Sequence, residues 1–360
     1  MNRVSELMRR AVETGVFPGA VLLVSRFDEI VFHEAFGVTD HVSSRPVKKD
    51  TVYDLASLTK PLATAPALMD LVDKGRISTE DRLGDIISEF AGSDKADIRI
   101  CHLLRHTAGL PDYRAYYREL VKFPRQKRKS RLRKMLADEP LLCSPGSVTL
   151  YSDPGYMILD WVVEKVSGTG LDRYLSKCVY EPLEIRDLFF TPDAGGKKAG
   201  RVFAPTEALD GGELLWACVH DENARAAGGV CGHAGLFGTA EGVFHLLKDL
   251  LLTVSGRSDS AVFFRSVAEK FLEVAEGKDR AMGFDTVSSV DSSSGSYFTP
   301  GCTVGHLGFT GTSFWMDLSS GVAVILLSNR ICPDRQNLKI RFFRPELHDA
   351  VMEQMLGKNN

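Results

Sequence analysis

The chain lacks the segments that would place a protein in or across a membrane. Its 360 residues contain no uninterrupted apolar run of the ~18 residues that a transmembrane helix needs. Residues 1–19 follow an amphipathic helix pattern and have neither the apolar core nor the small-residue cleavage site of a signal peptide. If Met1 is the native start, these absences predict a cytoplasmic protein with no membrane partner.

An excess of charge of one sign and a cysteine framework are also missing. Lys and Arg total 44 against 47 Asp and Glu, so the formal net charge of -3 gives no reason to expect nucleic acid as a partner. The 7 cysteines are odd in number, scattered and without a C-x-x-C pair, which argues against disulfides and against a zinc site. Residues 114–134 are strongly basic, and we interpret them as a solvated helix face because acidic residues balance them elsewhere.

Strand patterns occur at both ends of the chain. Residues 20–27 and 30–36 flank a short Asp-Glu turn and predict a β-hairpin. Three further strands are predicted near the C-terminus, over residues 304–307, 313–317 and 322–329. We expect the hairpin and these strands to share one antiparallel sheet.

Helix patterns and long loops fill the middle of the chain. The sequence therefore predicts an α/β (α+β) fold, in which residues 1–75 and 241–360 form a discontinuous sheet domain. Residues 76–240 would be a mostly helical insert, and the active site would lie between the two parts. No internal repeats are present.

Ser57-Leu58-Thr59-Lys60 is the only Ser-x-x-Lys in the chain, at the start of an apolar segment that predicts a helix to about Lys74. Pro66 argues against an unbroken helix there. A spacing of three places both side chains on one helix face, and a serine nucleophile needs a base within hydrogen-bond reach. The field of the helix N-terminus would lower the pKa of Lys60 and favour an alkoxide. An N-cap serine beside a solvated lysine is the alternative.

Two further segments carry candidate chemistry. Tyr151-Ser152-Asp153 follows a Ser-Pro-Gly turn, and its tyrosine is either a core residue or a general base whose phenolate a lysine stabilises. Gly305-His306-Leu307-Gly308 lies on a predicted strand, where glycines mark a close backbone approach. Such a strand edge can aim a backbone N–H at a developing oxyanion.

The order of these motifs resembles that of class C β-lactamase-like serine hydrolases, which include penicillin-binding proteins, D,D-peptidases and family VIII esterases. LLRHTAGLPDY at 103–113 and GHAGLFGTAEGVFHLL at 232–247 are also similar to family segments. The resemblance covers residues 3–356 and implies a β-lactamase/penicillin-binding-protein-like fold, with an antiparallel sheet flanked by helices.

The resemblance also implies roles for particular residues. Ser57 would be the acylated nucleophile, Lys60 its base or electrostatic support, and Tyr151 the proton shuttle. The backbone N–H groups of Ser57 and Phe309 would form the oxyanion hole. Asp153, His306 and Gly308 would contact the substrate, His306 through a substrate carboxylate or hydroxyl. Such a Ser–Lys–Tyr system needs no metal and no cofactor.

Two residues depart from the β-lactamase pattern. Asp153 stands where those enzymes have Asn, and an ionised carboxylate cannot donate to a substrate carbonyl. His306 stands where they have Lys, and histidine is only partly charged near neutral pH. Both departures argue against efficient penicillin hydrolysis and against strict D-Ala-D-Ala recognition.

The segment VHDENA at 219–224, followed by GGVCGHAG at 228–235, resembles a branch found beside or fused to β-N-acetylglucosaminidases of cell-wall recycling. That branch includes an N-acetylmuramyl-L-alanine amidase. The resemblance places this loop over the active-site rim, with four candidate substrate contacts: His220, Asp221, Glu222 and His233. A metal site built from His220, Asp221 and His233 is an alternative, but we expect no metal because adjacent residues rarely converge on one ion without a supporting helix or strand.

The sequence thus predicts a serine hydrolase that cleaves a small amide or ester, with a cell-wall-derived muropeptide as one such substrate. Three alternatives stay open: a promiscuous carboxylesterase, a β-lactamase or D,D-carboxypeptidase, and a non-catalytic binding protein on the same fold. The oligomeric state does not follow from the sequence.

Overall fold

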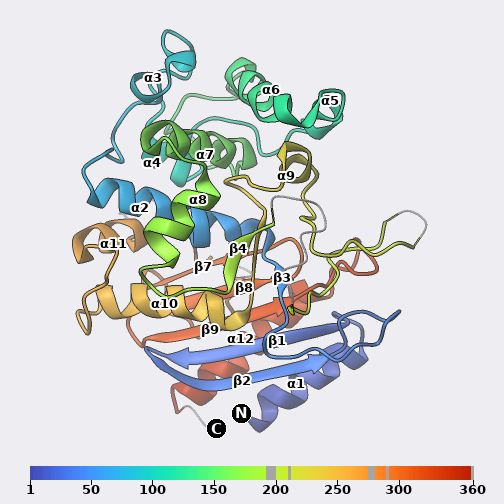
Figure 1. The fold of residues 1–360 in the computed structure, drawn as a ribbon. Coiled ribbons are helices and arrows are strands. Elements are labelled where there is room, and N and C mark those ends of the chain that lie inside the picture. Colours follow the sequence, from blue (N-terminus) through green and yellow to red (C-terminus); the bar gives the residue numbers. More distant parts are fainter. Residues whose placement is uncertain (192–199, 210–211, 275–279, 289–291, 358–360) are drawn as a thin grey trace.

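The two ends of the chain build one antiparallel sheet, as predicted. The computed structural model describes residues 1–191, 200–209, 212–274, 280–288 and 292–357. Its larger sheet has the strand order β2-β1-β9-β8-β7-β6, so the N-terminal hairpin pairs directly with the last strand of the chain (Figure 1). The strands are β1 (Gly19–Arg26), β2 (Glu29–Gly37), β6 (Asp285–Thr286), β7 (Thr303–Leu307), β8 (Ser313–Asp317) and β9 (Val322–Ser328).

Helices cover both faces of this sheet. Helices α1 (Asn2–Glu13) and α12 (Ile340–Met355) pack on one face, and α10 (Ala240–Val254) packs on the other (Figure 1). Alternate side chains of β1 serve the two faces: Leu22 joins the cluster under α1 and α12, whereas Leu23 joins the larger core. Side chains that alternate along a strand explain this division.

The helical part lies above the sheet and α10 (Figure 1). Its helices are α2 (Ala65–Asp73), α3 (Leu83–Ile86), α4 (Ile100–Leu104), α5 (Tyr117–Leu120), α6 (Arg125–Asp138), α7 (Asp153–Ser167), α8 (Leu171–Leu175), α9 (Glu222–Ala227) and α11 (Arg265–Leu272). One buried cluster runs from Leu23 in the sheet to Leu159 in α7. A single core thus joins the sheet and the helical part. The division into two domains stays a prediction.

A small second sheet connects the two parts. Its strands are β3 (Tyr53–Asp54), β4 (Leu188–Phe190) and β5 (Leu236–Gly238), in the order β3-β5-β4. Strand β3 leads directly into Ser57, and β5 follows the glycine-rich loop that carries His233. The pairing of β3 with β5 therefore fixes the backbone on either side of these two segments.

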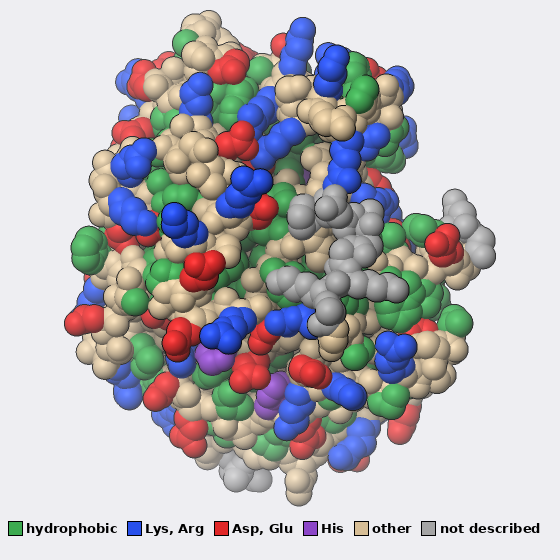
Figure 2. Space-filling model, in the orientation of Figure 1, with side chains coloured by type: hydrophobic (Ala, Val, Ile, Leu, Met, Phe, Trp, Pro, Cys, Tyr) green, Lys and Arg blue, Asp and Glu red, His purple; other side chains and the backbone are tan. Residues whose placement is uncertain are grey.

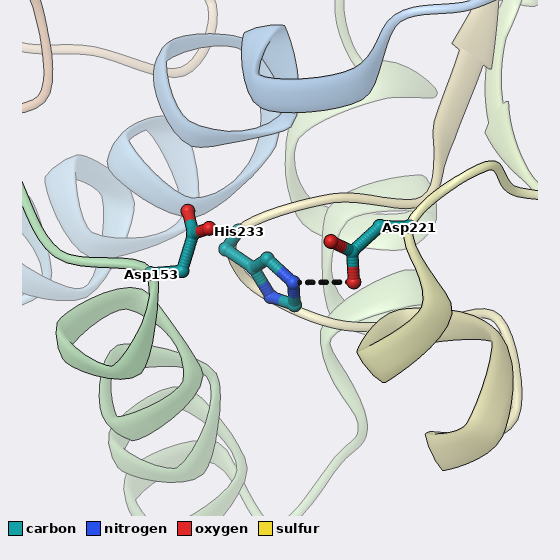
Figure 3. Close-up of side chains that lie close together, drawn as sticks. All are labelled: Asp153, Asp221 and His233. Carbon is teal, nitrogen blue, oxygen red and sulfur yellow. Dashed lines mark hydrogen bonds and ion pairs between the residues drawn. The ribbon is translucent and has the colours of Figure 1, made fainter. Parts of the chain in front are cut away.

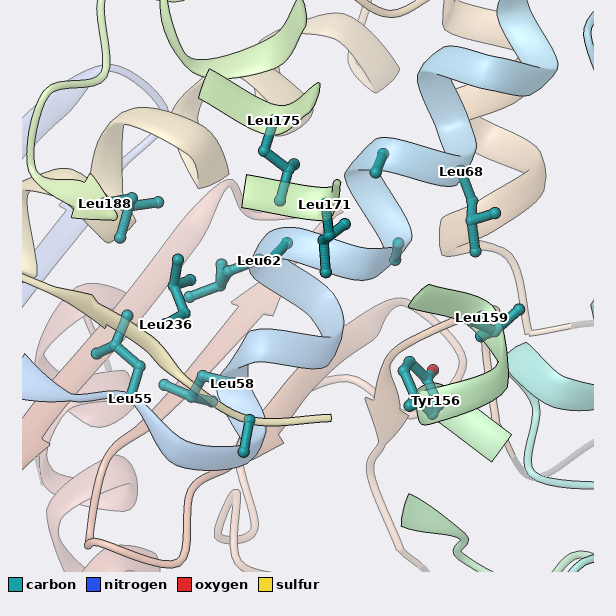
Figure 4. Close-up of a cluster of buried hydrophobic side chains, with 14 of the residues drawn as sticks. Leu55, Leu58, Leu62, Leu68, Tyr156, Leu159, Leu171, Leu175, Leu188 and Leu236 are labelled. Atoms are coloured by element: carbon teal, nitrogen blue, oxygen red, sulfur yellow. The ribbon is translucent and has the colours of Figure 1, made fainter. Parts of the chain in front are cut away.

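The segment after Ser57 is helical, as predicted, and it is not one unbroken α-helix. It begins with a 3-10 turn (Ala56–Leu58), continues as a π-helical turn (Lys60–Thr64) and becomes α2. Pro61 and Pro66 lie near the two ends of the wider turn, and each lacks the N–H that a regular ladder would use. Leu58, Leu62 and Leu68 nevertheless point into the common core (Figure 4).

The basic stretch forms α6, and its charges are matched by acidic neighbours. Lys129 and Arg133 both lie 2.8 Å from Glu164, and Arg131 lies 3.5 Å from Glu119. Figure 2 likewise shows basic side chains interspersed with acidic ones over this face of the molecule. This pairing agrees with a solvated helix face. Across the described ranges, no helix is both long enough and apolar enough to span a bilayer.

Candidate active site

Ser57 sits at a strained turn of the backbone. The preceding residue, Ala56, has φ +48, a left-handed conformation that costs energy for any residue with a Cβ. Two hydrogen bonds hold it there: the Ala56 N–H donates to Asp54 Oδ1 at 2.9 Å, and the Thr59 hydroxyl donates to the Ala56 carbonyl at 2.6 Å. The turn leaves Ser57 partly exposed, while its neighbours in the chain are buried.

Lys60 is fully buried below Ser57 and its ammonium group reaches three acceptors. Its Nζ lies 3.1 Å from Ser57 Oγ, 2.8 Å from Asp153 Oδ1 and 3.1 Å from the His233 carbonyl. Burial is the largest single influence and lowers the pKa of Lys60, but Asp153 and Tyr151 together raise it by more, so the pKa lies above its ordinary value. The predicted lowering of the Lys60 pKa is therefore wrong, because the sequence does not reveal that a carboxylate lies against the ammonium.

Tyr151 reaches the same two residues from the loop before α7. Its ring centroid lies 4.8 Å from Lys60 Nζ, and its hydroxyl interacts with Lys60 and Ser57. Burial raises the pKa of Tyr151, although Lys60 and Ser57 both act to lower it. The tyrosine is thus neutral at neutral pH, and the nearby ammonium favours its phenolate whenever the proton leaves.

His106 supports Tyr151 from below. The two rings stack at 4.4 Å, and His106 Nδ1 accepts the Ser152 N–H at 2.9 Å. Burial, followed by the charges of Arg280 and Lys60, holds the pKa of His106 well below its usual range, so the imidazole is neutral. This contact of His106 with the Tyr-Ser-Asp segment is a role that sequence reasoning missed.

Asp153 begins α7 in a fixed orientation. Ser152 caps the helix by accepting the Gly155 N–H at 3.2 Å, and the Asp153 N–H donates to the Asp112 carbonyl at 2.9 Å. The carboxylate then extends to Lys60. In this arrangement Asp153 balances the lysine charge, in addition to any contact with substrate.

The end of β7 forms the opposite side of the site. His306 is buried, its Nδ1 lies 2.8 Å from the Leu307 carbonyl, and its Nε2 has no partner in the described part of the chain. Burial and then the Lys60 charge hold the pKa of His306 well below its usual range. A neutral ring that donates through Nδ1 presents Nε2 as an acceptor, which suits a substrate hydroxyl or N–H and not a carboxylate.

Gly308 and Phe309 follow at the strand end. A Cβ on Gly308 would lie 2.1 Å from Thr312 Oγ1 and 2.8 Å from the Leu55 carbonyl, so only glycine permits this approach to the backbone before Ser57. Phe309 is 44% exposed, and within the described ranges its backbone N–H donates to no group. That free donor is consistent with the predicted oxyanion hole.

The four rim residues separate into two groups. His220 stacks its ring on Phe309 at 5.0 Å, and its Nδ1 lies 3.1 Å from Glu207 Oε2. Glu222 accepts from Arg335 at 2.8 Å. Asp221 and His233 instead face the Lys60–Asp153 pair, so the structure brings together only part of the predicted rim set (Figure 3).

Asp221 and His233 form an ion pair in which the histidine is buried and the aspartate side chain is 19% exposed. His233 Nε2 lies 2.8 Å from Asp221 Oδ1, and the same oxygen accepts the Ala224 N–H at 2.7 Å. Burial is the largest single influence and opposes both charges, but the neighbours together outweigh it. Asp221 and Cys231 hold the pKa of His233 well above its ordinary value, and His233 with the Ala224 N–H holds the pKa of Asp221 below its ordinary value. The histidine is therefore an imidazolium at neutral pH.

Asp153, Asp221 and His233 offer ligand atoms within 4.8 Å of one another, a spacing that a metal ion could bridge (Figure 3). Lys60 already pairs with Asp153, and protonated His233 pairs with Asp221 through Nε2. A cation would have to displace an ammonium and a proton. His220 is not part of this group, so the metal site considered from the sequence does not form.

Comparisons with known proteins agree with this geometry. A family model described as Beta-lactamase matches residues 4–341. Relatives from Escherichia coli O157:H7 and strain K12, both named "Putative D-alanyl-D-alanine carboxypeptidase", are 32% identical over 362 residues, which cover 92% of this chain and 82% of the relative.

Solved structures share the fold. The octameric penicillin-binding protein homologue from Pyrococcus abyssi aligns with a TM-score of 0.74 at 20% identity, over 99% of this chain and 78% of that one. EstCE1, a hydrolase with promiscuous acyltransferase activity, aligns with a TM-score of 0.76 at 22% identity, over 98% of each chain. With the architecture and the sequence match both in agreement, the chain belongs to the beta-lactamase family of serine hydrolases and has the β-lactamase/penicillin-binding-protein-like fold.

Proposed function

We propose that this protein hydrolyses a small amide or ester through an acyl-enzyme on Ser57, and that its substrate is a cell-wall-derived muropeptide amide. The observation that carries the acyl-enzyme is the position of Lys60 Nζ, 3.1 Å from Ser57 Oγ and anchored by Asp153 and the His233 carbonyl. A nucleophile with a fixed partner at hydrogen-bond distance is the arrangement that covalent catalysis requires.

The proton path follows from the charges of the site. The reactive form is the fraction of the enzyme in which Tyr151 has released its proton to solvent and the Lys60 ammonium stabilises the phenolate. Ser57 Oγ attacks the substrate carbonyl carbon, and its proton passes to this phenolate. Tyr151 then gives this proton to the leaving amine or alcohol as the bond to the carbonyl carbon breaks. A water molecule attacks the acyl-enzyme with Tyr151 as its base, and the proton returns to Ser57. Lys60 acts as electrostatic support throughout.

The same charges support the choice of substrate. Asp153 offers no N–H to a β-lactam carbonyl, and neutral His306 offers no cation to a neighbouring carboxylate. Both features favour an uncharged amide or ester group at this side of the pocket. The resemblance of residues 219–235 to the cell-wall recycling branch supports a muropeptide.

A second candidate, D-alanyl-D-alanine carboxypeptidase activity, is favoured by the names of the E. coli relatives. It requires recognition of a terminal carboxylate. Arg280 is a cation that could bind such a carboxylate, because its guanidinium lies 5.7 Å from the centroid of the Tyr151 ring. It already forms an ion pair with Asp285.

Intact-protein mass spectrometry after exposure to a fluorophosphonate tests these proposals. We expect a single adduct in the wild type and none in Ser57→Ala. Prior incubation with a MurNAc-peptide should block the adduct, whereas penicillin should not. Protection by a D-Ala-D-Ala peptide alone would favour the carboxypeptidase, and turnover of short esters with no protection by either peptide would favour a carboxylesterase. An unlabelled wild type would leave the binding-protein alternative.

A further inference from the structure

Asp54 lies where three segments around the proposed oxyanion hole meet. Its side chain is 3% exposed and both of its oxygens accept backbone donors: Oδ1 accepts the Ala56 N–H at 2.9 Å, and Oδ2 accepts the His220 N–H at 2.7 Å. Its own carbonyl accepts the Thr310 hydroxyl at 2.8 Å. One residue of β3 thus holds three segments that are far apart in the sequence.

Two of these segments carry the proposed oxyanion-hole donors. Ala56 directly precedes Ser57, and Thr310 directly follows Phe309. Besides the bond from Thr310 to the Asp54 carbonyl, a second hydrogen bond joins the same two segments: the Thr312 hydroxyl donates to the Leu55 carbonyl at 3.1 Å. The distance between the Ser57 and Phe309 N–H groups is therefore set by bonds through Asp54 and its neighbour.

The third segment fixes the Phe309 side chain. His220, whose N–H Asp54 holds, stacks on the Phe309 ring with only 5° between the planes. Arg330 donates to the Phe309 carbonyl at 3.0 Å, and its guanidinium lies 4.8 Å from the same ring. An exposed phenylalanine would otherwise be free to rotate, and this contact restrains the peptide that bears the donor.

We propose that Asp54 is a positioning residue for catalysis, whose ionised carboxylate and carbonyl hold the backbone N–H groups of Ser57 and Phe309 at the spacing that the developing oxyanion requires. The inference rests on the proposed acyl-enzyme at Ser57. Preorganised donors stabilise a transition state because they need no reorientation during the reaction.

The ionisation of Asp54 gives this role a measurable signature. Burial raises the pKa of Asp54 to about 6, against the two N–H donors that lower it. The titratable groups that face it are His220, Asp221 and Cys218, all from the 218–221 segment. A protonated carboxyl group would have one oxygen turned into a donor, so one of the two backbone bonds would be lost below this pH.

Two variants test the inference in the full-length protein. Asp54→Asn places an NH2 group against a backbone N–H, and Thr310→Val removes the hydroxyl with little change of shape. For a fluorophosphonate at neutral pH, we expect kinact to fall by about 10- to 100-fold in Asp54→Asn and by about 3- to 10-fold in Thr310→Val. KI should stay within about twofold. The decline of wild-type kinact below pH ~6 should disappear in Asp54→Asn.

Asp317→Asn is the matched control. Asp317 is also fully buried and accepts three backbone N–H groups, from Ser319 at 2.9 Å, Ser320 at 2.8 Å and Thr299 at 3.2 Å, at the far end of β8. It should lower Tm and leave kinact unchanged. Wild-type kinact in a folded Asp54→Asn overturns the inference. Where Asp54→Asn does not fold, unchanged kinact in Thr310→Val overturns it, and reduced kinact with constant KI supports it. A wild type that is not labelled at all overturns the proposed function first, and this inference with it.

Discussion

Two ion pairs of equal length lie side by side in the site, each with a buried cation and a partly exposed carboxylate. They differ in the residues that they connect. Lys60–Asp153 and His233–Asp221 are both 2.8 Å long. The first joins residues 93 positions apart, and its cation also contacts Ser57. The second joins residues 12 positions apart and closes one loop over the start of α9.

The difference separates chemistry from support. The Lys60 ammonium changes the charge that Ser57 and Tyr151 experience, so its loss alters the reaction directly. His233 reaches the site through its backbone carbonyl, which accepts from Lys60 whatever its side chain is. An ion pair inside the protein therefore does not by itself indicate a catalytic role. What matters is whether its charged groups also contact the reacting residues.

Lys60→Ala should produce the largest effect, because it breaks the first pair and leaves Asp153 without its cation. We expect the rate of acylation to fall by at least ~1000-fold and the free energy of unfolding to fall by about 3 kcal/mol. Stopped-flow labelling and urea unfolding measure the two. Lys74→Ala is the control, since Lys74 pairs with Asp70 at 2.7 Å on the following helix, outside the site. Acylation within tenfold of the wild type would show that the pair is structural.

Asp153→Asn should keep the shape of the first pair and remove its negative charge. Burial would then be opposed mainly by Tyr151, so the pKa of Lys60 should fall and the basic limb of the pH–rate profile should move to lower pH by at least about one unit. We expect a loss of ~10- to 100-fold in kcat at neutral pH. A pH–rate profile with an unmoved basic limb would mean that Lys60 does not control that limb.

His233→Gln should break the second pair with a smaller effect on the reaction. We expect the free energy of unfolding to fall by about 3 kcal/mol at pH 6 and the acylation rate to fall by less than about tenfold. The double variant with Asp221→Asn should recover part of the stability, because no buried charge is left alone. A catalytic loss as large as that of Lys60→Ala would end the distinction between the pairs.

The stability that the second pair supplies should depend on pH in a defined direction. The pKa of His233 is raised by folding, so its contribution is complete below the unfolded value of ~6.5 and is lost as the pH rises through the folded value. The pKa of Asp221 is lowered, so its contribution is present above ~3.9 and is lost on acidification. The Tm difference between wild type and His233→Gln should therefore be largest near pH 5–6 and should shrink toward pH 9.

Asp97→Asn gives the smallest expected effect and sets the baseline for the comparison. Asp97 lies 2.9 Å from Arg82, but the two side chains are 80% and 58% exposed. Water screens such a pair, so Tm should change by about 1 °C or less and acylation should not change. A larger shift would indicate that burial is not what separates this pair from the other two.

Local features of the sequence were sufficient for some parts of this site. Residues three apart lie on the same face of a helical turn, so the spacing alone brings the Ser57 and Lys60 side chains together. They remain together although the structure has a 3-10 turn and a π-helical turn here. The hairpin and the C-terminal strands follow from short runs of apolar and β-branched residues bounded by turn residues, which is a local pattern. The segment around Tyr151 left the role of the tyrosine open, and Phe309 entered only through the family resemblance. Nothing in either segment indicates which distant residue it approaches.

Only the tertiary structure decided the charges and the supports of the site. The contacts of Lys60 with Asp153 and of Asp54 with His220 join residues that are remote in the chain, and a pKa depends on burial and on neighbours that sequence spacing does not reveal. The predicted pKa direction of Lys60 failed for this reason. The chain alone determined which groups are present and which strands and helices they lie on; packing determined which of them meet, and hence which carry charge.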